Sequence, residues 1–299
     1  MLDKFWGSIA SDLAKRWLDY LFGPAFLFWG SGLGLYLWRT GLQENLAILQ
    51  TLTPVQQGIG IFVGLLILIF SSALLQAIRF PILRLLEGYW FWPLSYLGQG
   101  IIVLRTRSFQ KNYNELRRLK NLETKGDLDA KQHERIIQLD IWAHWNPSKA
   151  NDLLPTNLGN VLRSRERSPE RKFGLDAVVS WPRLWPLLPS NVREDLTNAR
   201  ASLDYLVELW FWGLLFLLWA SWTPWVILVS LLWMTISYGM ALQAAMTYGD
   251  LLESTFDLYR LLLYDAIKWP RPANLEDEKA AGKQLTEFLW RGTLPAKEN

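Results

Sequence analysis

Long uncharged stretches alternate with charge-rich ones along this chain, and the alternation predicts helices that cross a membrane. Residues 21–38 and 58–78 form one pair of apolar runs. A second pair begins near Tyr205 and continues, after Thr223 and Pro224, through residues 225–247. Each run approaches the roughly 20 residues that a helix needs to cross the hydrocarbon core. The short connection within each pair predicts two helical hairpins.

The segment between the two pairs predicts a helical domain with many charges. Charged helices are expected over residues 108–124 and 128–144, followed by a loop-rich stretch with short helices over 146–189. A cap-like start at Ser190 predicts one helix that continues into the third run, and the fourth run is expected to continue to just before Pro270. Glycine and proline interrupt the apolar stretch 88–105, which favours an interfacial elbow or a buried domain core over a further span.

Basic residues are distributed unequally between the two sides of the predicted membrane. Of 31 Lys and Arg, only Arg39 lies on the side of the two short connections, so 31 − 1 = 30 lie on the other side. Basic residues near span ends stay in the cytoplasm, so we expect both termini and the middle segment there. The predicted fold is all-α and polytopic, with four transmembrane helices in two hairpins and an inserted helical cytoplasmic domain. Its expected parts are an amphipathic interfacial helix (1–20), the first hairpin (21–78), the cytoplasmic domain (79–204), the second hairpin (205–248) and a cytoplasmic extension and tail (249–299).

Composition argues against several classes of chemistry. The chain has no cysteine, which excludes disulfides, thiolate metal sites and cysteine nucleophiles. Its two histidines, His133 and His144, do not form a metal site or a nucleophilic triad by their spacing, although Asp140 lies four residues before His144. Neither a phosphate-binding glycine loop nor a dinucleotide fingerprint is present. We therefore expect no enzyme activity and no cofactor.

Three sequence motifs carry a family resemblance. They are LPTNLGNVLR…GLDAVVSWPRLWPLLP within residues 154–189, YGDLLESTFDLYR from Tyr248, and LTEFLWRG over residues 285–292. In these motifs the chain resembles a family of uncharacterised bacterial integral membrane proteins. The resemblance implies a multi-pass protein of the bacterial inner membrane with four spans, and it implies no activity.

Polar residues form a stripe on the predicted fourth transmembrane helix and on its extension. At about 100° per residue they share one slowly drifting face. Hydrocarbon cannot satisfy such groups, so the stripe must face protein or water. It favours either ordinary packing between helices or the lining of a pore whose acidic mouth prefers cations. The candidate pore-lining residues are Thr235, Gly239, Gln243, Thr247, Asp250, Glu253 and Asp257.

Two other groups of residues are candidate binding surfaces. Basic clusters could meet anionic lipid headgroups, or they could be solvated faces with internal ion pairs, while the many nearby acids disfavour nucleic acid. The candidate headgroup contacts are Arg105, Arg107, Lys111, Arg163, Arg165 and Arg167. In the 154–189 region, an Asp–Arg pair among tryptophans could hold a ligand or a partner, or it could clamp an irregular loop. The candidates there are Asn157, Asn160, Asp176, Trp181, Arg183 and Trp185.

These features rank the functional hypotheses. The first is a homo-oligomeric, channel-like protein of the inner membrane, because four helices of one subunit rarely enclose a pathway. The alternative is a membrane-anchored scaffold that recruits a cytoplasmic protein partner through residues 154–189. A membrane-bound enzyme acting on lipid or nucleotide is the third hypothesis.

Overall fold

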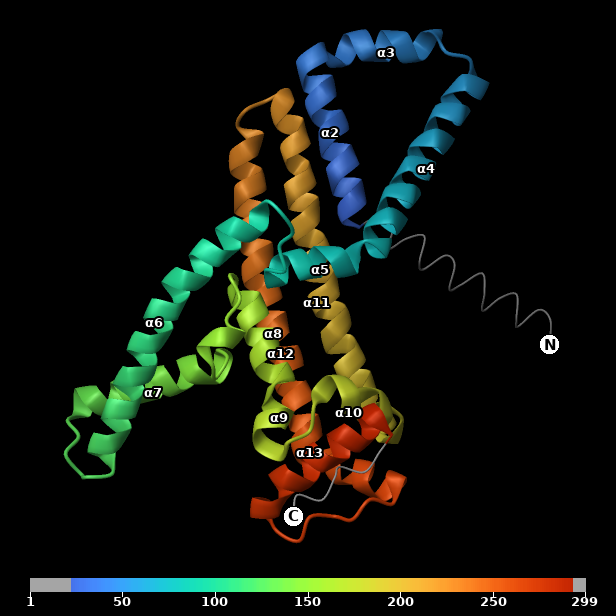
Figure 1. The fold of residues 1–299 in the computed structure, drawn as a ribbon. Coiled ribbons are helices and arrows are strands. Elements are labelled where there is room, and N and C mark those ends of the chain that lie inside the picture. Colours follow the sequence, from blue (N-terminus) through green and yellow to red (C-terminus); the bar gives the residue numbers. More distant parts are fainter. Residues whose placement is uncertain (1–22, 293–299) are drawn as a thin grey trace, which may run out of the picture. The chain divides into compact units, whose positions relative to one another are not determined.

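The chain folds into two compact units, and in the part that the computed structural model describes, residues 23–292, every regular element is a helix (Figure 1). Unit 1 comprises Met1–Leu83 and Asp204–Met240, and unit 2 comprises Arg84–Leu203 and Ala241–Asn299. The predicted interfacial helix at residues 1–20 lies outside the described residues. Three helices are long and apolar enough to cross a membrane, which supports a membrane protein: Pro54–Ala77, Ser190–Ser221 and Val226–Ile267.

Unit 1 contains the most apolar helices. These are α2 (Pro24–Thr40), α3 (Leu42–Thr51) and α4 (Pro54–Ala77), together with η3 (Leu217–Ser221) and parts of α5 (Arg79–Glu87), α11 (Ser190–Phe216) and α12 (Val226–Ile267). Thr53 and Gln56 form a capping box at the start of α4, which satisfies backbone donors that the first turn leaves open. The described α2 has 17 residues, which is about 26 Å at 1.5 Å per residue and slightly short of a hydrocarbon core of about 30 Å.

Aromatic side chains pack together in the interior of unit 1. The Phe28 ring of α2 lies 5.2 Å from Trp212 of α11 and 5.0 Å from Trp219 of η3, measured between centroids. Gly32 lies directly against the Trp219 ring, so a Cβ at this position would overlap it. Between α11 and α12, Trp233 Nε1 donates to the Leu209 carbonyl at 3.0 Å. Packing of rings on small residues therefore holds unit 1 together.

Unit 2 combines a long helical pair with a cluster of short helices. The pair is α6 (Leu94–Glu123) and α7 (Ala130–Trp145), which run side by side in opposite directions (Figure 1). The short elements are η1 (Ala150–Asp152), α8 (Asn157–Glu166), α9 (Ser168–Phe173), α10 (Ala177–Leu184) and η2 (Trp185–Leu187). Parts of α11 and α12 and the final helix α13 (Leu275–Arg291) complete the unit.

Close backbone approaches fix the short helices of unit 2. A Cβ at Gly159 of α8 would overlap the Glu87 carbonyl, and a Cβ at Gly282 of α13 would overlap the Phe173 carbonyl at the end of α9. Beside these contacts, Leu175, Tyr264 and Leu285 form one buried apolar cluster. Only glycine permits such approaches, so α8, α9 and α13 pack more closely than side chains would allow.

The helix boundaries confirm some sequence predictions and revise others. The single 42-residue helix α12 confirms that the fourth apolar run continues far beyond a membrane thickness, to Ile267. The helix predicted to begin at 108 begins at Leu94 instead, because Gly98 and Gly100 lie within α6 and do not interrupt it. The connection between the first two runs contains a further helix, α3, that the sequence did not predict.

Candidate functional site

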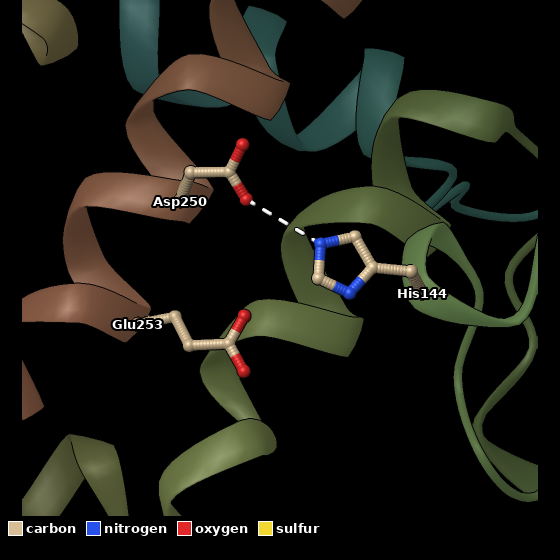
Figure 2. A group of neighbouring side chains, drawn as sticks. All are labelled: His144, Asp250 and Glu253. Carbon is tan, nitrogen blue, oxygen red and sulfur yellow. Dashed lines mark ion pairs between the residues drawn. The ribbon is translucent and has the colours of Figure 1, made fainter. Parts of the chain in front are cut away.

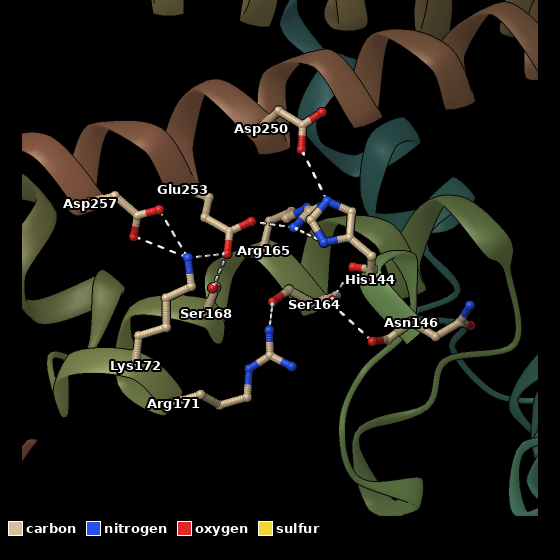
Figure 3. A network of polar contacts seen from close by, with 10 residues as sticks. All are labelled: His144, Asn146, Ser164, Arg165, Ser168, Arg171, Lys172, Asp250, Glu253 and Asp257. Carbon is tan, nitrogen blue, oxygen red and sulfur yellow. Dashed lines mark hydrogen bonds and ion pairs between the residues drawn. The ribbon is translucent and has the colours of Figure 1, made fainter. Parts of the chain in front are cut away.

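A buried arginine lies at the centre of a cluster of polar and charged side chains in unit 2. We call this group the Arg165 cluster; it lies where α12 passes the end of α7 and the α8–α9 region (Figures 2 and 3). The sequence favours this arrangement locally, because Thr156 caps the start of α8 by accepting a hydrogen bond from the Gly159 amide at 3.1 Å. Its members are His144, Arg165, Ser168, Lys172, Asp250, Glu253 and Asp257.

The Arg165 side chain is 1% exposed, and its guanidinium binds two carboxylates of α12. Nη1 donates to Glu253, and Nη2 lies 3.0 Å from Asp250 Oδ1. The guanidinium also lies over the Trp145 ring, 4.3 Å from its centroid. Gly249 makes room for this arrangement, because a Cβ there would overlap the arginine side chain. The buried charge thus has two anionic partners and an aromatic face, while its Nε and Nη2 groups form no hydrogen bond within residues 23–292.

Glu253 is the most strongly bound carboxylate of the cluster. It lies beyond the apolar part of α12 and accepts hydrogen bonds from Ser168 Oγ at 2.5 Å and from Lys172 Nζ at 2.8 Å. Burial by itself would raise the pKa of Glu253. The hydrogen bonds from Lys172 and Ser168 and the charges of Arg165 and Lys172 outweigh burial and lower this pKa to about 2. Glu253 is therefore ionised in the folded protein at neutral pH.

Three of these side chains have the composition of a metal site. Ligand atoms of His144, Asp250 and Glu253 all lie within 4.8 Å of one another (Figure 2). Two observations argue against a metal ion, however. Arg165 contacts both carboxylates, and its Nη1 lies 3.4 Å from His144 Nδ1, so a fixed positive charge already neutralises these groups and would repel a cation. The group is therefore better described as an ion-pair cluster that fixes α12 to α8 and α9.

The predicted pore-lining residues divide into two sets. Four of them are exposed along the apolar part of α12: Thr235, Gly239, Gln243 and Thr247. The two threonine hydroxyls donate to carbonyls one turn earlier, at 2.7 and 3.2 Å. The three acids expected at the pore mouth belong to the Arg165 cluster instead. Asp257, for example, accepts from Lys172 at 2.9 Å, so their charges are balanced by bases of the same unit.

The two candidate asparagines of the 154–189 region form hydrogen bonds within unit 2. Asn160 is buried; its Oδ1 accepts from the Leu154 amide at 2.7 Å, and its Nδ2 donates to the Leu154 carbonyl at 3.1 Å. Asn157 accepts from Arg105 Nη1 at 2.8 Å. Both side chains therefore stabilise the loop before α8, and the ligand role that we predicted for Asn160 is not available to a buried group with both polar atoms bonded.

The Asp–Arg pair and the tryptophans of the same region are structural clamps. Asp176 caps α10 by accepting from the amides of Val178 and Val179, at 2.8 and 3.2 Å. Arg183 donates to the carbonyl of Val179 at 2.7 Å and to that of Leu289 of α13 at 3.1 Å. The rings of Trp181 and Trp185 lie 5.5 Å apart and pack against the apolar cluster around Phe256.

The sequence did not predict the groove that α10 and α13 form. It has a volume of about 500 Å³. Val178 and Trp290 line it, and they are 73% and 72% exposed. The amphipathic spacing of residues 275–291 was the available signal, but no sequence pattern shows that this helix returns to α10. The groove residues are Glu170, Gly174, Asp176, Val178, Val179, Lys283, Thr286, Glu287, Trp290 and Arg291.

The predicted lipid-binding bases differ in their exposure. Arg107 and Lys111 are exposed on α6. Arg163 donates to Tyr89 Oη at 3.0 Å, and Arg167 donates to Glu170 at 3.0 Å, so both form internal pairs. Arg165 is buried, and its bonds within the cluster replace the predicted headgroup contact.

In unit 2 most of the candidate residues therefore form ion pairs and hydrogen bonds that stabilise the fold. The four candidates on the apolar part of α12 form an exposed polar stripe. Comparison of the chain with profiles of protein families, with curated proteins and with solved structures found no match in any of the three.

Proposed function

We propose that the protein is a homo-oligomeric, channel-like protein of the bacterial inner membrane, in which α12 helices of several copies face one another. The topology in this proposal has four spans in two hairpins, with α2 as the first span, and both termini in the cytoplasm. The observation that carries the proposal is the exposure of Thr235, Gly239, Gln243 and Thr247 on the apolar part of α12.

Gln243 gives the strongest physical reason for a second copy. Its amide has no hydrogen-bond partner among residues 23–292 and would be unsatisfied in hydrocarbon. A neighbouring copy or a water-filled path satisfies it. At Gly239 the surface is open, and glycine lets another helix approach closely. The alternative interpretation is that the stripe packs against helices of the same subunit. Its exposure argues against that interpretation.

The balance of charge in the Arg165 cluster limits the proposed cation preference. Glu253 and Asp257 are paired with Arg165 and Lys172, while Asp250 keeps half of its side-chain surface exposed. A path that ends here would meet one partly screened carboxylate per subunit. We therefore propose only weak selection for cations.

Cross-linking tests the oligomer separately from the pore. The chain lacks cysteine, so Gly239→Cys introduces a single thiol. We expect oxidation in native membranes to give disulfide-linked dimers from Gly239→Cys and little product from Met240→Cys, which lies about 100° around the same helix. Equal cross-linking at the two positions would contradict an interface along the stripe.

Conductance of the reconstituted protein tests the pore. We expect discrete conductance steps that Gln243→Leu reduces and that Met240→Leu, a change of similar size off the stripe, leaves unchanged. If Gly239→Cys forms cross-links but the reconstituted protein shows no conductance, the oligomer would stand and the channel function would be contradicted.

The groove between α10 and α13 favours a second function, a scaffold that recruits a cytoplasmic protein. Two large apolar side chains, Val178 and Trp290, remain exposed in it, and such concave apolar surfaces bind amphipathic helices. A photo-cross-linking residue at Trp290 should give one defined adduct in cells that Val178→Asp abolishes. Leu258, which is equally exposed outside the groove, supplies the control position. The same adduct from Leu258 would remove the groove from consideration.

A further inference from the structure

Residues 89–104 of unit 2, which we call the apolar corner, comprise the loop before α6 and the first turns of this helix. Residues 89–104 contain no charged side chain. Phe91 and Trp92 are 69% and 74% exposed, and Tyr96, Leu97 and Leu104 are also largely exposed. Exposed apolar patches of this kind mark an interaction surface. The sequence left open whether this stretch forms a domain core or an interfacial elbow, and its exposure argues against a core.

The corner is held in this orientation by contacts on its inner side. Trp90 Nε1 donates to the Leu85 carbonyl at 2.8 Å, and a Cβ on Gly98 would lie 3.2 Å from the Trp90 ring. Gly88 adopts a φ of +98° against Pro155. Because Trp90 is fixed inward, the next two aromatic residues point outward and cannot fold into the core of unit 2.

The exposed face of α6 changes from apolar to basic along its length. Tyr96, Val103, Arg107 and Lys111 recur at helical spacing and are all exposed. No acid occurs between Glu87 and Glu115. The exposed guanidinium and ammonium groups, from Arg107 onward, therefore begin about one turn after Val103 and Leu104. This order matches the order of layers at a bilayer surface, in which acyl chains are followed by phosphates.

We propose that residues 89–104 insert into the headgroup layer of an anionic bilayer, with Arg107 and Lys111 on lipid phosphates. Two observations favour lipid over a protein partner. Only eleven residues (78–88) separate this corner from the end of the apolar helix α4 at Ala77, and tryptophan and tyrosine beside basic residues are typical of membrane interfaces. The proposal is independent of the pore, because it concerns a different helix and needs only a membrane-embedded chain.

Site-directed spin labelling of the full-length protein tests the insertion. Single cysteines replace Phe91, Trp92 or Leu97 in the cysteine-free chain, which is reconstituted into phosphatidylcholine vesicles containing phosphatidylglycerol. We expect labels at these positions to collide often with oxygen and rarely with a water-soluble nickel chelate. A label at Val178, equally exposed in the same unit, should show the opposite. Nickel access at all positions would overturn the proposal.

Charge reversal tests the basic part of the surface. Arg107→Glu with Lys111→Glu should raise nickel access at position 92 several-fold in vesicles with phosphatidylglycerol, and much less in vesicles of phosphatidylcholine alone. Arg118→Glu is the matched control: it lies on the same face of α6, roughly 16 Å further along, and should have no effect. Low access to both reagents together with spin–spin broadening would show that a second copy covers the corner, which would also overturn the proposal.

Discussion

The two units are stabilised by different kinds of contact. In unit 1, rings pack on rings and on small residues, as Phe28 does on Trp212 and Trp219. In unit 2, a buried arginine bonds two acids, and glycines bring backbones into contact. The difference follows from the surroundings that each unit is expected to have. Lipid provides no hydrophobic drive between helices, so close packing has to hold them together.

The comparison also predicts which unit is less tolerant of change. Side chains in a packed aromatic cluster can shift by small rotations, so a substitution in unit 1 is shared among several neighbours. A buried charge or a backbone contact has no such freedom, because an unpaired ion or a displaced carbonyl cannot be satisfied elsewhere. We therefore expect unit 2 to show the larger and more local losses of stability.

Arg165→Met should give the largest effect. The change removes the buried cation that pairs with both Glu253 and Asp250, and breaking a buried pair in this way typically costs about 3–5 kcal/mol. Hydrogen exchange measured by mass spectrometry should show faster exchange in α8, α9 and the second half of α12, with unit 1 unchanged. Arg167→Met, on an exposed pair, should change the free energy of opening by less than about 1 kcal/mol. Equal exchange in the two variants would contradict the role of the cluster.

Acid should weaken unit 2 through Glu253. Its pKa is about 2 in the folded protein against an ordinary 4.5, so the folded state favours the ionised form. This stabilisation is complete above the ordinary pKa and is lost as the pH falls from about 5 towards 2. The lowered pKa corresponds to a stabilisation of about 3 kcal/mol.

A titration of thermal stability isolates this carboxylate. Melting temperatures in detergent, followed at pH values from 6 to about 3, should fall more steeply for the native chain than for Glu253→Gln. Asp257→Asn serves as control, because its bond to Lys172 is more exposed. Parallel curves for the native chain and Glu253→Gln would show that Glu253 has an ordinary pKa.

Two glycine substitutions compare the units directly. Gly159→Ala places a methyl group against the Glu87 carbonyl, whereas Gly32→Ala places one against the outer edge of the Trp219 ring. Overpacking typically costs about 1–3 kcal/mol. We expect Gly159→Ala near the upper end, because backbone cannot move aside, and Gly32→Ala near the lower end, because a ring can rotate. Gly30→Ala, which meets open space, is the control.

The sequence predicted the class of fold better than the candidate site, for a physical reason. Hydrophobic periodicity is local, so the continuous α12 and the helical character of residues 79–203 could be read from spacing. The partners of a charged residue are not local. Nothing in the spacing of Arg165, 88 residues before Glu253, shows that the two meet. The acids were therefore interpreted as a pore mouth and the arginine as a contact for lipid headgroups.

Some predictions failed because one local signal has two structural meanings. Gly98 and Gly100 suggested a break, but a glycine in a helix also permits close packing, and Gly98 packs on Trp90. For Asp176 and Arg183 the sequence left a ligand site and a structural clamp open, because Asp and Arg are equally suited to binding a ligand, to capping and to bonding carbonyls. The position of α13 decides between the two roles for Arg183, because this side chain donates a hydrogen bond to the Leu289 carbonyl of α13.

The smallest expected loss of stability comes from a change to the Trp233 indole. It also tests whether ring packing or hydrogen bonding stabilises unit 1. Trp233→Phe retains a ring for packing but removes the 3.0 Å hydrogen bond to the Leu209 carbonyl between α11 and α12. A single neutral hydrogen bond contributes about 0.5–1.5 kcal/mol, so the melting temperature should fall by only a few degrees. Trp233→Ala removes the ring as well, including its stacking on Phe216, and should cost about 3–5 kcal/mol. If the two variants were equally destabilised, polar bonding and not ring packing would hold unit 1, and the contrast between the units would not stand.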